Sequence, residues 1–253
     1  MIGLKSDREI SLMAKAGEIV GKVFERLEDE VRPGIETKRL DTIANDLIKS
    51  LGGKSAFFGY KGFPGNICVS INEAVVHGIP GERRIGEGDI VSLDVGVEFQ
   101  GYCADGAATF AAGKISEEAK RLMDVTERSL HLGIAEAMAG SRLSDISSAI
   151  QSYVEKNAFS VVRAFVGHGI GSKMHEEPEI PNFGPPNRGV RLEPGMALAI
   201  EPMVNQGTYD IEILEDGWTA VTADRKLSAH FEHTIVVSEG EPRILTLWQK
   251  KNR

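Results

Sequence analysis

Three apolar runs of the 253-residue sequence each carry one carboxylate among small residues. If these runs are β-strands, alternate side chains face opposite sides, so one face packs and the other presents the acid. The acids are Asp94 in the run 90–99, Glu201 in the run 196–201 and Glu232 in the run 228–237. A half-exposed sheet would account for any one of the runs. Small neighbours beside all three acids favour a cavity that a ligand fills.

A fourth carboxylate, Asp105, is predicted to lie beside Asp94. Residues 98–101 are typical of a hairpin connection, and pairing about their centre places the two acids directly opposite each other. Directly opposed side chains lie about 5 Å apart. Two unscreened charges about 4 Å apart repel by about 4 kcal/mol at an effective dielectric constant of about 20. Either one of the acids therefore takes a proton, or a cation lies between them.

The positions of the histidines favour the cation. Five of the six lie in predicted strand and loop segments, at positions 77, 168, 175, 230 and 233. His168 is flanked by glycines in the run GHGIG, which lets the backbone approach a ligand closely. Carboxylates with one or two imidazoles suit Mn, Fe(II), Co or Zn. Two such divalent ions about 3.5–4 Å apart would neutralise four acids and ionise a water molecule between them.

Competing catalytic motifs are incomplete. The run GKS at 53–55 ends like a phosphate-binding loop, but position 48 is Ile where that loop needs Gly. GHGIG at 167–171 lacks the next glycine of a dinucleotide-binding fingerprint, and the sequence has no HExxH, HxxEH or GxSxG. Nucleotide-binding, zincin and serine-hydrolase functions therefore lose support.

The composition predicts a globular protein that binds neither nucleic acid nor membranes. The 37 acids exceed the 29 Lys and Arg residues for a net charge of −8, which disfavours nucleic acid as a partner. No uncharged apolar run reaches membrane-spanning length, and the N-terminal segment turns polar by residue 5, unlike a secretory signal. Cys68 and Cys103 form neither a metal clip nor a disulfide framework, so reduced thiols and a cytoplasmic location are expected.

The candidate residues must be positioned by helices and strands that alternate along the chain. A capping box at Ser6 and Glu9 begins a first amphipathic helix, and Thr37 is predicted to be the N-cap of a second. A second helix pair is expected over 116–138 and 144–158. The expected strands span 67–71, 90–99, 102–110, 161–166, 196–201, 211–214, 218–222 and 231–237. This order predicts an α+β fold.

A short internal repeat suggests a duplication. GDIVSLD at 88–94 and GMALAIE at 195–201 both run from Gly through an apolar segment to a carboxylate six positions later. Two halves of about 125 residues would each present one such strand. No Ser- or Pro-rich linker separates the halves, so one compact domain spanning 1–253 is expected.

Five residues and the segments around them resemble the type I methionine aminopeptidases. The residues are Asp94, Asp105, His168, Glu201 and Glu232, and the segments are GNICVSINEAVVHGIP, SLDVG, YCAD, VGHGIG, HEEP, LEPGMALAIEP and FEHTIVV. The resemblance covers essentially the whole chain. It implies the pita-bread fold, in which pseudo-twofold duplicated helices pack on a curved antiparallel sheet. It also implies a single catalytic domain over 1–253, without an N-terminal extension domain, that acts as a monomer.

By this resemblance, the five residues would hold two divalent metal ions, which we expect to be Co, Mn, Fe(II) or Zn. Asp94, Asp105 and Glu232 would hold one ion. Asp105 and Glu232 would also bridge to the second ion, and His168 and Glu201 would complete its ligands.

The resemblance also implies catalytic roles. Glu201 would take a proton from the bridging water and return it to the leaving amine. His77 would lie near the scissile amide, and His175 near the carbonyl oxygen, where it would stabilise the developing negative charge. His230 stands where the family commonly has Gln. Because an imidazole titrates near neutral pH, we expect His230 to add an acidic limb to the pH–rate profile.

A soft and partly aromatic pocket would receive the methionine side chain of the substrate. The residues that the resemblance assigns to its lining are Phe57, Tyr60, Phe63, Cys68, Met174 and Trp218, together with His77 and His175.

The expected function is the removal of the initiator methionine from nascent proteins whose second residue is small, with the ribosome as a candidate partner. One alternative is an Xaa-Pro-type aminopeptidase of the same fold, although such relatives usually carry an extra N-terminal domain. Another is a non-catalytic peptide-binding member, although such members typically lose metal ligands. Hydrolysis by a metal-free acid pair would require activity that survives chelation.

Overall fold

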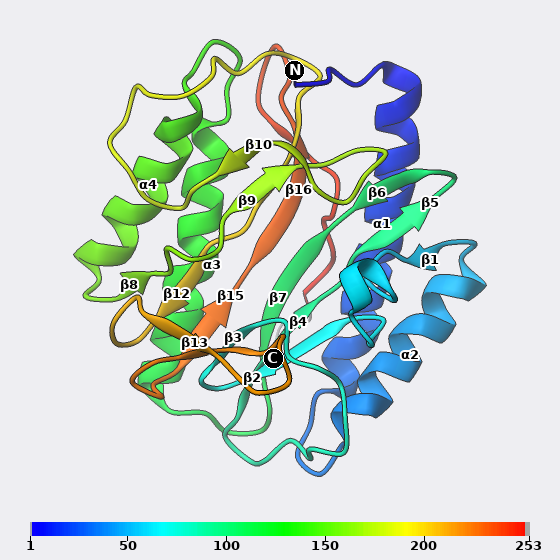
Figure 1. The fold of residues 1–253 in the computed structure, drawn as a ribbon, viewed down its shortest axis with the longest axis vertical. Helices are drawn as coiled ribbons and strands as arrows, with labels where there is room; N and C mark the ends of the chain where they lie inside the picture. The colour runs from blue at the N-terminus through cyan, green and yellow to red at the C-terminus, as the bar shows by residue number, and fades with distance from the viewer. Residues whose placement is uncertain (1, 251–253) are drawn as a thin grey trace.

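Two pairs of helices flank a set of strands in the computed structural model, which describes residues 2–250 (Figure 1). Residue 1 and residues 251–253, the ends of the predicted domain, lie outside the described residues. The helices are α1 (Asp7–Glu30), α2 (Thr37–Ser50), α3 (Glu117–Glu136) and α4 (Leu143–Lys156). Figure 1 places α1 and α2 together on the right and α3 and α4 together on the left. Within residues 2–250, no helix is long and apolar enough to cross a membrane.

The first two helices begin where side chains satisfy backbone groups. The predicted capping box of α1 is confirmed, since Ser6 Oγ accepts from the Glu9 amide and Glu9 Oε2 accepts from the Ser6 amide at 2.8 Å. The predicted N-cap of α2 is wrong by one residue. Glu36 is the N-cap, and Thr37 is the first helical residue because its hydroxyl accepts instead from the Gly81 amide at 2.8 Å.

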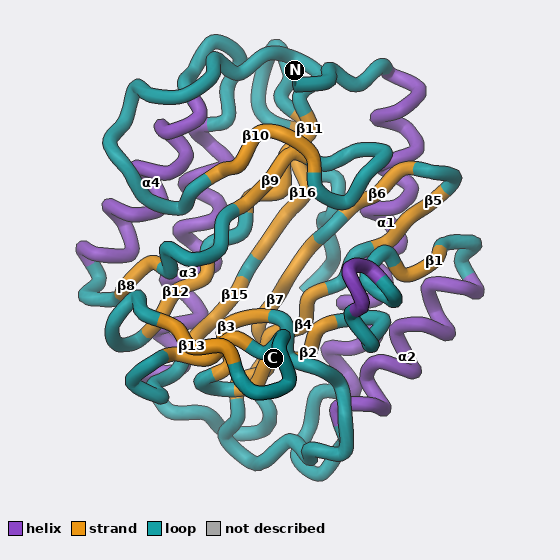
Figure 2. The backbone as a smooth tube through the Cα atoms, viewed as in Figure 1, coloured by secondary structure: helices purple, strands orange, loops and turns teal. Residues whose placement is uncertain are grey.

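Strands form one large sheet and three small ones, and Figure 2 shows them crossing the centre of the molecule. The first-half strands are β1 (Lys54–Ser55), β2 (Cys68–Ile71), β3 (Ala74–Val76), β4 (Ile90–Asp94), β5 (Val97–Phe99), β6 (Tyr102–Ala104) and β7 (Gly106–Ala111). The second-half strands are β8 (Ser160–Val161), β9 (Gly167–Gly169), β10 (Glu176–Ile180), β11 (Ala197–Ile200), β12 (Met203–Asn205), β13 (Ile211–Ile213), β14 (Ala220–Thr222), β15 (Ser228–His230), β16 (Glu232–Val236) and β17 (Arg243–Ile244). A single 3-10 turn, η1 (Tyr60–Gly62), lies in the connection between β1 and β2.

The order of the strands confirms the predicted duplication. The large sheet runs β2-β4-β7-β16-β11-β9, with β10 beyond β9, so equivalent strands of the two halves stand symmetrically about the β7–β16 pair. Two of the small sheets are also equivalent to each other: one is β1-β5-β6 in the first half, and the other is β8-β12-β15 in the second half. The repeated sequences at 88–94 and 195–201 contain β4 and β11, which are equivalent strands. The α+β class follows from the same elements.

The predicted pairing of Asp94 directly opposite Asp105 is wrong. Asp94 pairs with Ala107, because the connection of the hairpin is the two-residue turn Gln100-Gly101. Both turn residues have positive φ, +49° and +86°, as a tight two-residue hairpin turn requires. This register places Asp105 opposite the position two residues after Asp94. The two acids therefore lie diagonally on one face of the sheet, still within reach of each other.

Several predicted strands are longer than the observed ones. The run 90–99 is divided into β4 and β5, and only Val161 of the run 161–166 belongs to a strand. The division falls at Gly96, where a Cβ atom would lie 2.5 Å from both Met174 Cε and Phe57 Cε1. Side chains from two loops therefore press against the backbone at the point where the strand is interrupted.

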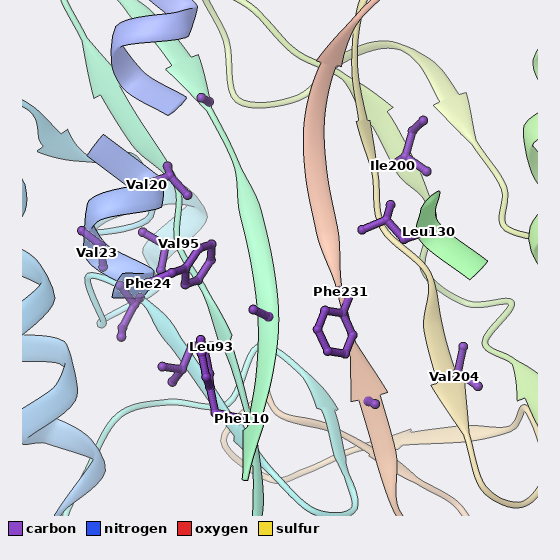
Figure 3. Close-up of a cluster of buried hydrophobic side chains, with 14 of the residues drawn as sticks. Val20, Val23, Phe24, Leu93, Val95, Phe110, Leu130, Ile200, Val204 and Phe231 are labelled. Carbon is purple, nitrogen blue, oxygen red and sulfur yellow. The ribbon is translucent and has the colours of Figure 1, made fainter. Parts of the chain in front are cut away.

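The apolar faces of the central strands and of both helix pairs form the main core. Figure 3 shows Val20 and Phe24 of α1 beside Leu93 and Val95, and Leu130 of α3 beside Ile200. The alternation predicted for β4, β11 and β16 is confirmed, because the residues predicted to pack, such as Leu93, Leu198 and Ile235, belong to this core. The opposite face, which carries the acids, is left free to build a site.

Candidate metal and substrate site

Three of the predicted ligands form a compact buried group. Asp105 lies between β6 and β7, Glu232 begins β16, and His168 is the middle residue of β9. One ligand atom from each lies within 4.8 Å of the others. Only 4%, 2% and 6% of these residues, in the same order, is exposed. Such burial of two acids and one imidazole calls for a compensating charge.

The other two predicted ligands border this group. Glu201 directly follows β11, and its Oε1 lies 3.6 Å from His168 Nε2. Asp94 ends β4, opposite Cys68 of β2, and it is close enough to Asp105 for its charge to raise the pKa of that residue. The structure thus brings all five residues to one end of the neighbouring strands β4, β7, β16, β11 and β9.

The four carboxylates are held together without a basic partner. No lysine or arginine within residues 2–250 forms an ion pair with any of them. Burial raises the pKa of Asp94 to about 7. Burial, and then the charges of Asp94 and Glu201, raises the pKa of Asp105 well above its usual range. Burial and neighbouring carboxylates raise the pKa of Glu201 and Glu232 in the same way.

The donor set fits a divalent cation. Asp94 Oδ1 and Glu232 Oε1 are buried oxygen atoms without a hydrogen-bond partner, and each such group costs about 1–3 kcal/mol unless something satisfies it. His168 Nδ1 lies 2.9 Å from the carbonyl oxygen of Gly169. When Nδ1 donates to that oxygen, Nε2 presents its lone pair toward the acids, as in metal-binding histidines. Oxygen and imidazole donors without thiolate suit the divalent ions that the sequence predicts.

Two further histidines stand at the rim of the acid cluster. His175 Nδ1 lies 2.9 Å from the hydroxyl of Tyr60, and the His175 ring is 4.2 Å from that of His168. His77 follows β3 with a positive φ of +60°, packed edge-on against Phe165. Burial lowers the pKa of both rim histidines, and the charge of Lys61 adds to the effect. Both imidazoles are therefore neutral near pH 7.

One cavity of about 140 Å³, which we call the site cavity, joins the acid cluster to an aromatic surface. Its lining comprises Phe57, Tyr60, Lys61, Phe63, Cys68, His77, Asp94, Asp105, His168, His175, Glu201, Trp218 and Glu232. All the predicted site residues except Met174 are among them. Met174 is buried behind Phe57 and contacts Gly96, so its side chain supports the cavity from outside.

Lys61 is the lining residue that the sequence reasoning missed. It lies in η1, between the pocket residues Tyr60 and Phe63, and its ammonium group is 5.4 Å from the centre of the Tyr60 ring. The sequence around Lys61 gives no reason to assign it to the site, because a lysine in a loop is usually exposed to solvent. The flanking glycines, Gly59 and Gly62, were the available signal, because they indicate a tight turn that presents its central side chain.

His230 is buried beside Glu201. The residue is 2% exposed, and its Nε2 has no hydrogen-bond partner and lies 4.0 Å from Glu201 Oε2. Burial, and then the charge of His77, lowers the pKa of His230 to about 3. The imidazole is therefore neutral around pH 7, so this burial does not support an acidic limb near neutrality, and the limb stays a prediction for the pH–rate profile. The sequence pattern gave no sign of this burial, because the strand face that carries His230 is covered by the packed molecule.

Known proteins share this fold and sequence. The model of metallopeptidase family M24 matches residues 11–239. The methionine aminopeptidase of Clostridium perfringens is 54% identical over 98% of this chain and 99% of its own length. Methionine aminopeptidase 1 of Bacillus subtilis is 54% identical over 97% of this chain and 99% of its own length. The chain belongs to metallopeptidase family M24 and, within it, to the methionine aminopeptidases.

Solved structures agree with this assignment. The crystal structure of methionine aminopeptidase from Thermotoga maritima superposes with a TM-score of 0.96 at 45% identity, over 97% of this chain and 99% of that one. The Xaa-Pro dipeptidase of Bacillus anthracis has a TM-score of 0.79 at 24% identity and is covered over 63% of its length, so it shares the fold alone. The predicted family and the pita-bread fold are confirmed, and the Xaa-Pro alternative is not favoured.

Proposed function

We propose that this chain is a metal-dependent aminopeptidase that removes the N-terminal methionine from nascent proteins whose second residue is small. The observation that carries the proposal is the site cavity, in which a buried carboxylate cluster meets a sulfur- and aromatic-lined surface. The cavity volume of about 140 Å³ is well below the roughly 300–1,000 Å³ of pockets for drug-sized ligands. It therefore suits the side chain of one terminal residue.

Two divalent metal ions, with Co, Mn, Fe(II) and Zn as the candidates, would be held by the five residues of the acid cluster. Asp94, Asp105 and Glu232 would bind one ion, and Asp105, Glu232, His168 and Glu201 the other. The unpartnered buried oxygens of Asp94 and Glu232 support this division, because a cation would satisfy both. When bound, the ions neutralise the carboxylates and lower the pKa of water, which makes a nucleophile available at neutral pH.

Glu201 is proposed to carry the proton. Its burial between His168 and His230, 3.6 and 4.0 Å away, holds the carboxylate in one orientation. It can then accept a proton from the attacking water and return it to the amine that leaves.

His175 and His77 are proposed to position the scissile amide. The hydrogen bond with Tyr60 holds the His175 ring, and a neutral imidazole can donate a hydrogen bond to a carbonyl oxygen as negative charge develops there. His77, between Phe165 and Trp218, faces the same cavity and would contact the amide nitrogen.

The aromatic surface is proposed to bind the methionine side chain. Phe63 and Trp218 meet edge to face with their ring centres 5.1 Å apart, and Phe57 and Cys68 complete the surface. Aromatic rings and a thiol are favourable neighbours for a thioether. A single catalytic domain, a cytoplasmic location, a monomeric state and work close to the ribosome complete the proposal.

Methionine release by metal-stripped protein tests the function. We expect the peptide Met-Ala-Ser to be cleaved only after a divalent metal is added back, and Ala-Pro-Ala to stay intact with every metal. Release of alanine from Ala-Pro-Ala would favour an Xaa-Pro peptidase instead. Binding of both peptides without cleavage under any metal would favour a non-catalytic member, and cleavage that survives chelation would overturn metal dependence.

A further inference from the structure

The site cavity opens into a larger polar groove along β9 and β10. This groove, which we call the exit groove, has a volume of about 670 Å³. Its lining is Gly3, Lys61, Val166, Gly167, His168, Ser172, Lys173, His175, Glu176, Glu177 and Glu179. It shares three residues with the site cavity, namely Lys61, His168 and His175. If the cavity holds the first residue of a peptide, the residues that follow leave past these three side chains.

The backbone presents Lys61 at this junction. Its φ is +49°, a left-handed conformation that non-glycine residues rarely adopt, and Gly59 and Gly62 on either side have φ of +80° and +92°. The turn exposes the lysine side chain and places its ammonium group 5.4 Å from the Tyr60 ring. Since the Tyr60 hydroxyl also contacts His175, the lysine is tied to the rim of the cavity.

The charge of Lys61 is not neutralised by any residue that the structure describes. Within residues 2–250, Lys61 has no carboxylate at ion-pair distance. Of the three acids in the groove wall, Glu176 directly follows the rim residue His175. Its Oε2 forms an ion pair with Lys5 Nζ at 2.6 Å. The remaining two acids of the wall, Glu177 and Glu179, are exposed on β10. Lys61 and both rim histidines line the site cavity, so the lysine charge lies beside the position proposed for the scissile amide.

We propose that Lys61 selects substrates by the charge of their third residue and favours an acidic side chain there. The inference rests on the proposed function, since it takes the first residue to fill the cavity and the second to lie at His175. The third side chain is then the first to enter the exit groove, beside the lysine ammonium. An acidic side chain finds an unpaired cation at this point, whereas a basic one meets repulsion.

Three peptide amides with the second residue held as Ala provide the test. Their third residue is Asp, Asn or Lys, and the C-terminal amide removes the only other carboxylate of the peptide. We expect kcat/KM to fall in the order Asp, Asn, Lys, with about three- to tenfold between the extremes at low salt, as for a partly exposed ion pair. Raising the salt from about 0.05 M to about 1 M should shrink the ratio.

Variants of this chain assign the preference to one side chain. Lys61→Met should bring the Asp to Lys ratio close to one, and Lys61→Glu should reverse the order. Lys156→Met, at the exposed end of α4, is the matched control and should keep the wild-type order. Moving the charged residue from the third to the sixth position should remove most of the effect.

The outcomes separate the two proposals. Equal kcat/KM for the three peptides in the wild-type protein would overturn the role of Lys61 and leave the aminopeptidase function intact. A preference that survives Lys61→Met but disappears in Lys173→Met would also overturn it, because the selecting cation would then be Lys173. Failure of every metal-loaded preparation to release methionine from any peptide would instead reject the proposed function.

Discussion

Two surfaces meet in the site cavity, and the chain builds them differently. The carboxylate floor, made of Asp94, Asp105, Glu201 and Glu232, lies at the ends of the adjacent strands β4, β7, β11 and β16 of one sheet or directly beside them. The aromatic wall, made of Phe57, Tyr60, Phe63 and Trp218, comes from the connection between β1 and β2 and from the turn before β14. Groups whose burial is costly stand on hydrogen-bonded strands, and groups that only need to fit a side chain stand on loops.

The two surfaces differ in how much displacement of a side chain they tolerate. A carboxylate that shifts relative to its neighbours changes the repulsion among four buried acids, which is steep at short range. An aromatic ring that shifts loses some contact area, a loss that scales with the area removed. Variants of the floor should therefore affect chemistry and folding, and variants of the wall should affect substrate binding.

Removing the proton carrier from the floor is expected to have the largest effect. Glu201→Gln keeps the size and an oxygen ligand but cannot take up a proton, so kcat should fall by about 10²- to 10⁴-fold. Metal content measured on the same sample should stay close to that of the wild type. Glu215→Gln, at an exposed turn, is the control. Full activity of Glu201→Gln with metal bound would contradict the assigned role.

Without metal, the buried carboxylates of the floor should make the stability of the folded protein depend on pH. Burial raises the pKa of Asp94 from 3.8 to about 7 in the folded protein. A group with a raised folded pKa favours the folded state fully below its unfolded pKa and loses that contribution as pH rises through the folded value. The metal-free protein should therefore lose a few kcal/mol between about pH 4 and pH 7 from this group.

Thermal unfolding with a chelator, measured from pH 5 to pH 8, checks this expectation. The melting temperature of the metal-free protein should fall by about 5 °C or more across the range. Metal should restore it most strongly at the alkaline end, because the metal competes with protons for the same oxygens. Asp94→Asn should flatten the metal-free profile, and an equally flat profile in the wild type would sink the idea.

Truncating the aromatic wall should weaken binding more than chemistry. Trp218→Ala removes the edge-to-face partner of Phe63 and one side of the cavity. We expect KM for Met-Ala-Ser to rise by about tenfold with kcat changed much less, since burial of a large side chain is worth about 1.5–3 kcal/mol. Phe58→Ala is a useful control, because this neighbouring ring is 65% exposed and does not line the cavity.

A smaller effect is expected from an ion pair outside the site cavity, between Lys5 and Glu176. Lys5 Nζ lies 2.6 Å from Glu176 Oε2, with 8% and 19% of the two side chains exposed, and Glu176 Oε1 accepts from the Lys173 amide at 3.1 Å. This contact anchors the loop that carries His175. Lys5→Met should lower kcat/KM by about two- to fivefold, acting mainly on kcat, and Lys5→Arg should recover most of the loss. Equal activity in Lys5→Met would show that the loop holds His175 without the anchor.

Local patterns predicted the elements better than the contacts between them. The capping box at Ser6 and the alternation in β4 hold in the structure because each depends on neighbouring residues. The hairpin register failed because Gln100 and Gly101 form a shorter turn than the sequence indicated. The burial of His230, which lowers its pKa, could not be predicted from the strand, because exposure is a property of the packed molecule.

The sequence by itself determined the types of residues at the site and the faces on which they lie. Strand alternation places Asp94, Glu201 and Glu232 opposite the packing residues, and this depends only on the period of a β-strand. Tertiary structure decided which ligands meet, because His168 stands 63 residues after Asp105 and the pairing of the two halves brings the two residues together. It also decided that Met174 supports the cavity while Lys61 lines it, since loop side chains take their positions from the surfaces they pack against.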